Sequence, residues 1–261
     1  MRTLLVIGIG AGDPGQLTLQ AIDAIKRADV FLIVDKGEAK RDLVDLRRAL
    51  LATHRPDAGY EVVELEDPPR DRAPDDYEHA VLDWHARRAA LFADTIAATV
   101  PEHGTGAFLV WGDPTLYDSI LRILEQVQHD ARVPLAVEVV PGITSVQALA
   151  ARHRIPLNRI GEAIHITTGR QLSQGLPPGV ANAIVMLDAR HSYAALEERE
   201  PGAWHIWWGA NLGTRSEQLV SGPIAEAAPA IARAREAARD AAGWVMDTYL
   251  VRRDEPAALP S

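Results

Sequence analysis

The chain of 261 residues has no cysteine and few aromatic residues, 5% in all. The missing cysteine excludes disulfides, thiolate metal sites and cysteine nucleophiles. The nine histidines include no His-x-x-x-His or His-Glu-x-x-His pair, so we expect no metal site. No apolar run approaches the roughly 18 residues that cross a bilayer, and a net charge of −9 argues against nucleic acid or anionic membrane as partners. We therefore expect a cytoplasmic protein without nucleic-acid or membrane partners.

The first part of the chain alternates apolar strand patterns with helical patterns. Near-continuous apolar strands separated by helices indicate a parallel sheet covered on both faces. The predicted strands are 4–8, 30–34, 60–65 and 106–111, and the predicted helices are 17–28, 41–53 and 77–99.

After Asp113 strands outnumber helices, which indicates a second domain. The last two strands have half-buried patterns, and we expect them to pair antiparallel. The fold class is therefore α/β, with an N-terminal domain over 1–114 that has a parallel sheet and a C-terminal domain over 115–261 that has a mixed sheet. The predicted strands are 135–140, 163–167, 183–187, 204–208, 217–222 and 244–251, and the predicted helices are 119–129, 145–153, 192–199 and 225–241.

The segment Leu4–Asp13 is an apolar strand that ends in a loop with glycine at three alternate positions. A dinucleotide-binding loop reads Gly-x-Gly-x-x-Gly, with its last glycine where the helix packs close to the strand. This chain has Asp13 at that position, and an acidic side chain there would repel a phosphate. The loop therefore favours a ligand other than a dinucleotide.

Three more glycine-containing turns follow predicted strands, at 111–119, 140–145 and 210–218. In α/β sheets ligands bind outside the carboxyl ends of the strands. Glycine allows backbone N–H and C=O groups to approach a ligand without a Cβ between them. Any one of these turns can simply end a strand, but four together predict a ligand site.

These four turns resemble the S-adenosylmethionine-dependent tetrapyrrole methyltransferases. The matching motifs are Gly-x-Gly-x-Gly-Asp-Pro-x-x-Leu-Thr over 8–18, Gly-Asp-Pro-x-x-Tyr over 112–117, Val-Pro-Gly-Ile-Thr-Ser over 140–145, and Gly213-Thr214 with Gln218. The resemblance implies two α/β domains with the cofactor cleft between them, S-adenosyl-L-methionine as cofactor, S-adenosyl-L-homocysteine as its product, and a homodimer. The cofactor-binding residues that it implies are Ala11, Asp113, Leu116, Thr144, Ser145, Leu187 and Gly213. At Leu187 the family often has methionine followed by glycine, whereas Asp188 follows here.

Three less general segments, 33–48, 208–214 and 244–253, resemble the members that methylate precorrin-5 at C1 with loss of acetate. The resemblance thus implies a tetrapyrrole substrate with several carboxylates and a locally basic site. The candidate substrate-binding residues in strand-end loops are Lys36, Lys40, Arg41 and Arg170. Asp35, at the end of strand 30–34, is the candidate catalytic group, although a solvated acid paired with a neighbouring lysine explains it equally well.

Alternative functions stay open at this point. Another member of the family would act on a different precorrin or on uroporphyrinogen. A nicotinamide-dependent oxidoreductase has Gly8, Gly10 and Asp35 as its only support. A binding module that has kept the site without catalysis is a fourth possibility.

Overall fold

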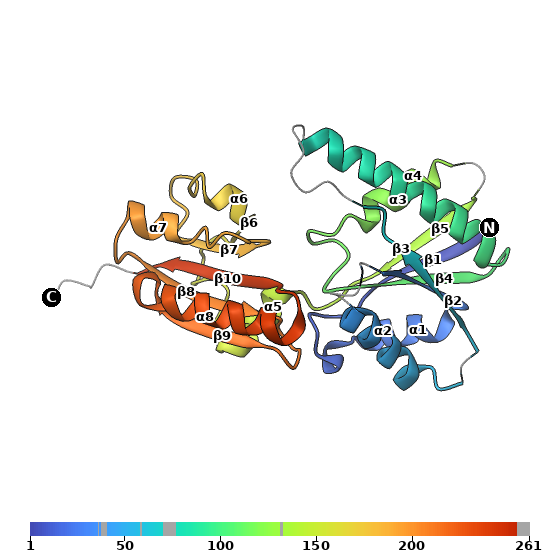
Figure 1. Ribbon diagram of the computed structural model, residues 1–261, viewed down its shortest axis with the longest axis horizontal. Helices are drawn as coiled ribbons and strands as arrows, with labels where there is room; N and C mark the ends of the chain where they lie inside the picture. The colour runs from blue at the N-terminus through green and yellow to red at the C-terminus, as the bar shows by residue number, and fades with distance from the viewer. Residues whose placement is uncertain (36, 38–40, 58, 70–76, 131–132, 255–261) are drawn as a thin grey trace. The chain divides into compact units, whose positions relative to one another are not determined.

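The computed structural model describes the chain except for residues 36, 38–40, 58, 70–76, 131–132 and 255–261. It contains two compact units, and each has its own sheet (Figure 1). The first unit comprises Met1–Gly10 and Pro14–Thr144, and the second comprises Ala11–Asp13 and Ser145–Ser261. The boundary thus differs from the predicted one at 114, because the strand over 135–140 pairs in parallel with the first strand of the chain.

The first unit is built on a five-stranded parallel sheet with the order β3-β2-β4-β1-β5. The strands are β1 (Arg2–Gly8), β2 (Val30–Asp35), β3 (Glu61–Glu66), β4 (Thr105–Val110) and β5 (Leu135–Val140). The helices are α1 (Leu19–Arg27), α2 (Arg41–His54), α3 (Tyr77–Thr99) and α4 (Ile120–Gln128), and a 3-10 turn, η1, covers Pro14–Gln16.

Helices cover both faces of this sheet, which confirms the prediction from its apolar strands. Successive side chains of a strand point to opposite faces. In β1, Leu4 therefore packs in one core with α3 and α4, whereas Leu5 packs in another with α1 and α2. Both leucines are fully buried. Within the described residues, no helix is long and apolar enough to cross a membrane.

The second unit has a mixed five-stranded sheet with the order β6-β7-β10-β8-β9. Among the described strands of this sheet, β6 and β7 pair in parallel and the other neighbours pair antiparallel. The strands are β6 (His165–Thr168), β7 (Asn182–Met186), β8 (Trp204–Ala210), β9 (Gln218–Pro223) and β10 (Asp247–Arg253). The helices are α5 (Ser145–His153), α6 (Gly169–Leu172), α7 (Ala194–Arg199) and α8 (Ile224–Ala242).

Strand β10 corrects one prediction about this unit. The last two strands do not pair with each other, because β10 lies between β7 and β8 while β9 pairs with β8. Its central position also makes β10 almost wholly buried rather than half-buried. Tyr249 of β10 and Trp208 of β8 face each other in the register and belong to one core.

Candidate functional site

Three glycine turns meet at the carboxyl edge of the first sheet. Gly8 ends β1, Gly112 follows β4 and Gly142 follows β5, and these three strands are neighbours. A Cβ on Gly8 would lie 2.6 Å from the Gly142 nitrogen and 2.9 Å from the Gly112 oxygen. A Cβ on Gly142 would collide with the same Gly112 oxygen and lie 2.8 Å from the Gly8 carbonyl carbon. Only glycine fits at positions 8 and 142, because the three turns pack backbone against backbone at this edge.

A short antiparallel bridge joins the first two of these turns. The Gly112 N–H donates to the Gly10 oxygen at 2.7 Å, and the Gly10 N–H donates to the Gly112 oxygen at 3.3 Å. Gly10 and Gly112 have φ values of 81° and 67°, in the region that favours glycine. The sequence motif around 8–15 and the motif around 111–119 therefore form one structural element.

Asp113 connects the second turn to the third. One carboxylate oxygen accepts hydrogen bonds from the Thr115 N–H at 2.8 Å and from the Thr115 hydroxyl, and the other accepts from the Gly142 N–H at 2.8 Å. Burial by itself would raise the pKa of Asp113, but these bonds outweigh it and hold the pKa below the ordinary value. Both oxygens thus stabilise the loops, and direct contact with a cofactor stays a prediction for Asp113.

The other predicted cofactor residues near these turns fall in both units. Leu116 and Thr144 are partly buried in the first unit. Ala11 and Ser145 belong to the second unit, where Ala11 is buried. The Ser145 oxygen lies 2.9 Å from the hydroxyl of Thr248, which donates to it across α5 and β10.

Gly213 forms a second tight backbone approach, within the second unit. Its φ is 77°, and a Cβ there would lie 2.5 Å from the Asp13 nitrogen. The Gly213 N–H donates to Glu217 at 2.6 Å. Arg152 connects both loops, with ion pairs to Glu217 at 3.0 Å and to Asp13 at 3.4 Å. Residues 11–13 of the first motif and the late turn at 213 therefore pack together.

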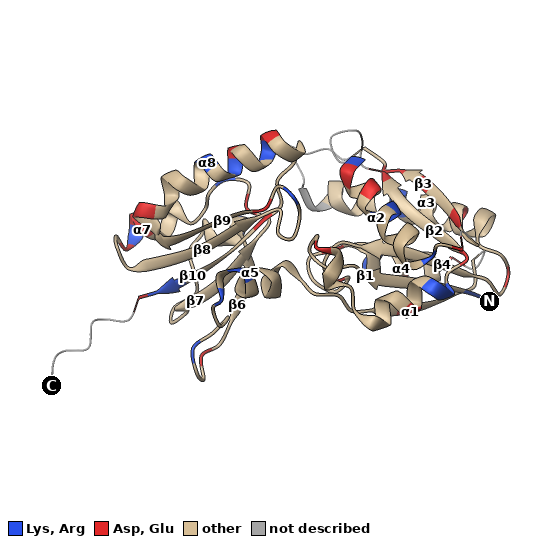
Figure 2. Cartoon of the chain, turned by 90° about the horizontal axis from the view of Figure 1, so that it is seen from below, with Lys and Arg blue, Asp and Glu red and all other residues tan. Residues whose placement is uncertain are grey.

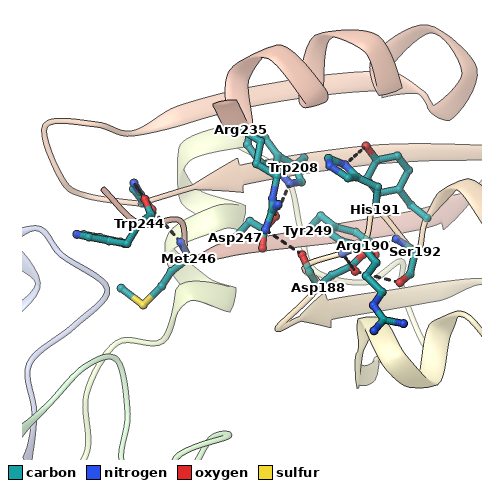
Figure 3. Close-up of polar contacts among 12 residues, drawn as sticks. Asp188, Arg190, His191, Ser192, Trp208, Arg235, Trp244, Met246, Asp247 and Tyr249 are labelled. Atoms are coloured by element: carbon teal, nitrogen blue, oxygen red, sulfur yellow. Dashed lines mark hydrogen bonds and ion pairs between the residues drawn. The ribbon is translucent and has the colours of Figure 1, made fainter. Parts of the chain in front are cut away.

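Leu187 and Asp188, where the sequence departs from the family pattern, have opposite environments. Leu187 has a φ of 56° and is 65% exposed, whereas Asp188 is buried. The Asp188 carboxylate accepts from the Ser192 N–H at 2.7 Å, the Ser192 hydroxyl at 2.9 Å, the Arg190 N–H at 2.9 Å and the Tyr249 hydroxyl at 2.7 Å (Figure 3). Asp188 therefore organises its loop, and sequence reasoning gave it no role although its departure from the pattern was visible.

A buried ion pair extends this network across the sheet. Arg235 of α8 lies 2.9 Å from Asp247 of β10, and the Trp208 indole donates to the same carboxylate at 3.4 Å (Figure 3). Burial raises the pKa of Asp247 despite the opposing charge of Arg235. Burial, together with the charge of Asp188, raises the pKa of Tyr249 well above its ordinary range. These groups bond mainly to one another, which makes the network structural.

The predicted substrate-binding cations are placed as follows. Arg41 lies 3.2 Å from Asp35 and 3.0 Å from Glu64, and Arg48 lies 2.7 Å from Glu64. Glu64 is the main reason why the pKa of Arg41 is raised. Basic and acidic positions accordingly lie side by side around α2 and β3 (Figure 2). Arg170 is exposed in α6 of the second unit, and Lys36 and Lys40 lie outside the described residues.

Asp35 lies at the carboxyl end of β2, as expected, and one of its carboxylate oxygens accepts from the Gly37 N–H at 2.9 Å. Among the described residues its ionic partner is Arg41, at 3.2 Å; Lys36 and Lys40 lie outside the described residues. Within the part of the chain that is described, no three histidine, aspartate or glutamate side chains gather as a metal site.

Comparisons with known proteins agree with this geometry. A family model described as Tetrapyrrole (Corrin/Porphyrin) Methylases matches residues 3–228. The chain is 45% identical over 253 residues to the precorrin-6A synthase [deacetylating] of Sinorhizobium sp, which covers 97% of this chain and 96% of that protein.

Two solved structures extend the comparison. A putative cobalamin synthesis related protein (CobF) from Corynebacterium diphtheriae is 42% identical, covers 98% of this chain and 100% of its own, and superposes with a TM-score of 0.83. A uroporphyrin-III C-methyltransferase from Thermus thermophilus, solved with S-adenosyl homocysteine, is 18% identical. It covers 96% of this chain and 92% of its own with a TM-score of 0.60, and therefore shares the fold.

Proposed function

The chain belongs to the tetrapyrrole (corrin/porphyrin) methylase family, and we propose that it methylates precorrin-5 at C1 and releases acetate, giving precorrin-6A. The observation that carries this proposal is the 45% identity to the Sinorhizobium precorrin-6A synthase over 97% of the chain. A match of that length includes both sheets, and therefore both the glycine edge of the first unit and the Gly213 turn of the second.

The proposed cofactor is S-adenosyl-L-methionine, which supplies an electrophilic methyl group when it is bound. Gly8 and Gly142 hold the motif turns tightly together at the carboxyl edge of the first sheet, because a Cβ at either position would collide with the backbone of a neighbouring turn. We assign cofactor contacts in the first unit to Asp113, Leu116 and Thr144, and in the second to Ala11, Ser145, Leu187 and Gly213. Family membership and the order of the four motifs support this assignment.

Methyl transfer to carbon is an in-line displacement, so alignment of the reactants can supply much of the rate. Rigid backbone turns can provide that alignment without a nucleophilic side chain. In the hydrolytic half, water attacks the acetyl carbonyl, the bond from that carbon to C1 breaks, and its electron pair remains on C1 to form the bond to the methyl group. A base or an oxyanion-stabilising group accelerates the attack by water.

Asp35 is the proposed base for that water. It ends β2 at the carboxyl edge of the first sheet, and Arg41 and the Gly37 N–H hold its carboxylate. Replacing it, Asp35→Asn, should slow acetate release about 100-fold or more if it is the base. Asp23→Asn, on the exposed surface of α1, is the matched control. Unchanged turnover in Asp35→Asn would remove Asp35 from the mechanism and leave it a surface ion-pair residue.

The reaction itself is tested by mixing the purified chain with precorrin-5 and S-adenosyl-L-methionine. We expect acetate and the methylated product in equal amounts. Methyl transfer to another precorrin or to uroporphyrinogen without acetate would instead indicate a different branch of the family. Calorimetry with S-adenosyl-L-homocysteine and with NAD distinguishes a methyltransferase from an oxidoreductase. A methyltransferase should bind S-adenosyl-L-homocysteine and not NAD.

The oligomeric state and location follow from the family resemblance. We propose a homodimer that works in the cytoplasm on a soluble tetrapyrrole. Light scattering of the purified chain tests the first part, since a monomer at working concentration would contradict it.

A further inference from the structure

Arg47 of α2 contacts strand β4 of the first sheet, beyond the point where β4 stops pairing with β2. Strands β2 and β4 pair only from Val30 opposite Gly106 to Leu32 opposite Phe108. Beyond that point the Arg47 Nε donates to the Leu109 oxygen of β4 at 2.8 Å. Its Nη1 donates to the Leu43 oxygen, one turn earlier in α2, at 2.7 Å. The guanidinium is therefore fixed just before the Gly112 turn.

The charge of Arg47 has no ionic partner among the described residues. Both of its hydrogen bonds go to backbone carbonyls, so they use two of the five N–H donors of a guanidinium. Nη2 makes no hydrogen bond there, and it is not completely buried. By contrast Arg48, the next residue of α2, is paired with Glu64, and Arg88 of α3 is paired with Asp67.

This environment favours an incoming anion. Burial lowers the pKa of Arg47 to about 10, and the charge of Asp118 compensates only in part. The cation is thus retained at neutral pH but is incompletely stabilised. A carboxylate that approached Nη2 would restore the stabilisation through a charge-assisted hydrogen bond.

The position of Arg47 is also one where α/β sheets bind ligands. Helix α2, which follows β2, packs in one core, and α4, which follows β4, packs in the other. Adjacent strands whose following helices go to opposite faces leave a crevice at their carboxyl ends. Arg47 lies at the carboxyl ends of β2 and β4.

We propose that Arg47 binds a carboxylate side chain of the tetrapyrrole substrate through its Nη2, which makes it a specificity-determining residue. This inference rests on the proposed function, because only that function supplies a tetrapyrrole acid. Arg41, one of the four candidates named from the sequence, differs from Arg47 in that it is paired with Glu64 and Asp35.

The test compares Arg47→Gln, Arg47→Lys and the control Arg48→Gln with the unaltered chain. We expect Arg47→Gln to raise KM for precorrin-5 roughly 10- to 100-fold, with kcat changed far less and affinity for S-adenosyl-L-homocysteine unchanged. Arg47→Lys keeps the charge without the fork, so its KM should be intermediate. Arg48→Gln should match the unaltered chain. Unchanged KM in Arg47→Gln, or a parallel loss of affinity for S-adenosyl-L-homocysteine, would overturn the inference.

A binding measurement tests the role of Arg47 without relying on the proposed reaction. Uroporphyrin III and its methyl ester are titrated into each protein, and porphyrin fluorescence reports binding. The unaltered chain should prefer the free acid about tenfold or more, and Arg47→Gln should lose that preference. If the chain releases no acetate from precorrin-5 but still shows this Arg47-dependent preference, the proposed reaction fails and the inference stands. Equal preference in both proteins overturns it.

Discussion

The two units differ in which groups make their polar contacts: backbone turns in the first unit and buried side chains in the second. In the first unit, the turns after β1, β4 and β5 approach one another as bare backbone, and Asp113 fixes them with bonds from neutral donors. In the second unit, side chains supply the polar groups, and Asp188 and Asp247 are buried among Tyr249, Arg235 and Trp208. The first arrangement packs backbone against backbone, whereas the second is made by side chains that satisfy one another. We infer that the first edge is organised for binding and that the second network is organised for stability.

The largest expected effect comes from adding one methyl group to the first edge. Gly142→Ala places a Cβ against the Gly112 oxygen and 2.8 Å from the Gly8 carbon, and neither backbone can move without breaking the sheet edge. We expect the free energy of unfolding to fall by about 3 kcal/mol or more, and binding of S-adenosyl-L-homocysteine to be lost. Urea denaturation and calorimetry measure the two effects.

Gly59→Ala is the matched control in the same unit. The nearest atom to a Cβ there is the Asp57 carboxylate at 3.0 Å, which is the flexible end of a side chain. The affinity of Gly59→Ala for S-adenosyl-L-homocysteine should equal that of the unaltered chain. If Gly142→Ala and Gly59→Ala behave alike, the backbone approach at the first edge has no special role.

The second effect belongs to the network of the second unit. Tyr249→Phe removes the hydroxyl that donates to the buried Asp188 carboxylate at 2.7 Å. Loss of a hydrogen bond to a charged group should lower the free energy of unfolding by about 2 kcal/mol, without changing the affinity for S-adenosyl-L-homocysteine. Tyr60→Phe is the control, because the described residues give its hydroxyl no hydrogen bond. If Tyr249→Phe also lost affinity for S-adenosyl-L-homocysteine, the network of the second unit would serve binding as well as stability, contrary to our inference.

The third prediction concerns pH and has opposite signs in the two units. The pKa of Asp113 is lowered in the folded chain, so its stabilisation is present above its ordinary pKa and is lost as pH falls through the folded value. The pKa of Asp247 is raised, so its contribution is present in acid and is lost as pH rises through the folded value. Hydrogen exchange resolved by unit should show the first edge opening earlier below the ordinary pKa of 3.8.

The variant Asp113→Asn tests whether the carboxylate of Asp113 causes the pH dependence of the first edge. At pH 7 it should be less stable than the unaltered chain by about 1.5 kcal/mol, and the difference should shrink at pH 3. A difference that stays constant with pH would mean that the carboxylate charge of Asp113 is not what stabilises the turns.

The smallest effect is expected at the contact between α5 and β10. Thr248→Val removes a hydroxyl that donates to Ser145 at 2.9 Å and should cost about 1 kcal/mol. A double-mutant cycle with Ser145→Ala isolates the pair, since each single change removes the same bond. A coupling energy near zero would mean that the bond between Thr248 and Ser145 does not stabilise the fold. Ser145 would then keep only its proposed role in cofactor binding.

Most elements of the fold were predictable because their local signals agree with their burial. The apolar run 30–34 became β2, and helix 145–153 has the predicted bounds. The domain boundary at 114 was not predictable in this way. Composition changes near that residue, but the pairing of β5 with β1 depends on contacts far apart in sequence.

The candidate site was predictable at its glycines and much less so at its side chains. Turn motifs are local, so the sequence shows that 8–15 and 111–119 each follow a strand, whereas their meeting depends on the pairing of β1 with β4. The partners of charged side chains are set by tertiary packing. Asp35 pairs with Arg41, and Arg47 donates to the Leu109 oxygen of β4, and neither contact has a local signature in the sequence.

The strand order of the first unit has a consequence for synthesis of the chain. Strand β1 is made first, yet its two partners are β4 and β5, which begin at Thr105 and Leu135. At about 5–20 residues per second, the ribosome needs on the order of ten seconds to expose both partners. During that time Leu4–Ile7, which is fully buried in the folded chain, lacks one or both of its neighbouring strands. The apolar start of the chain is therefore the segment on which we expect a holding chaperone to act during translation.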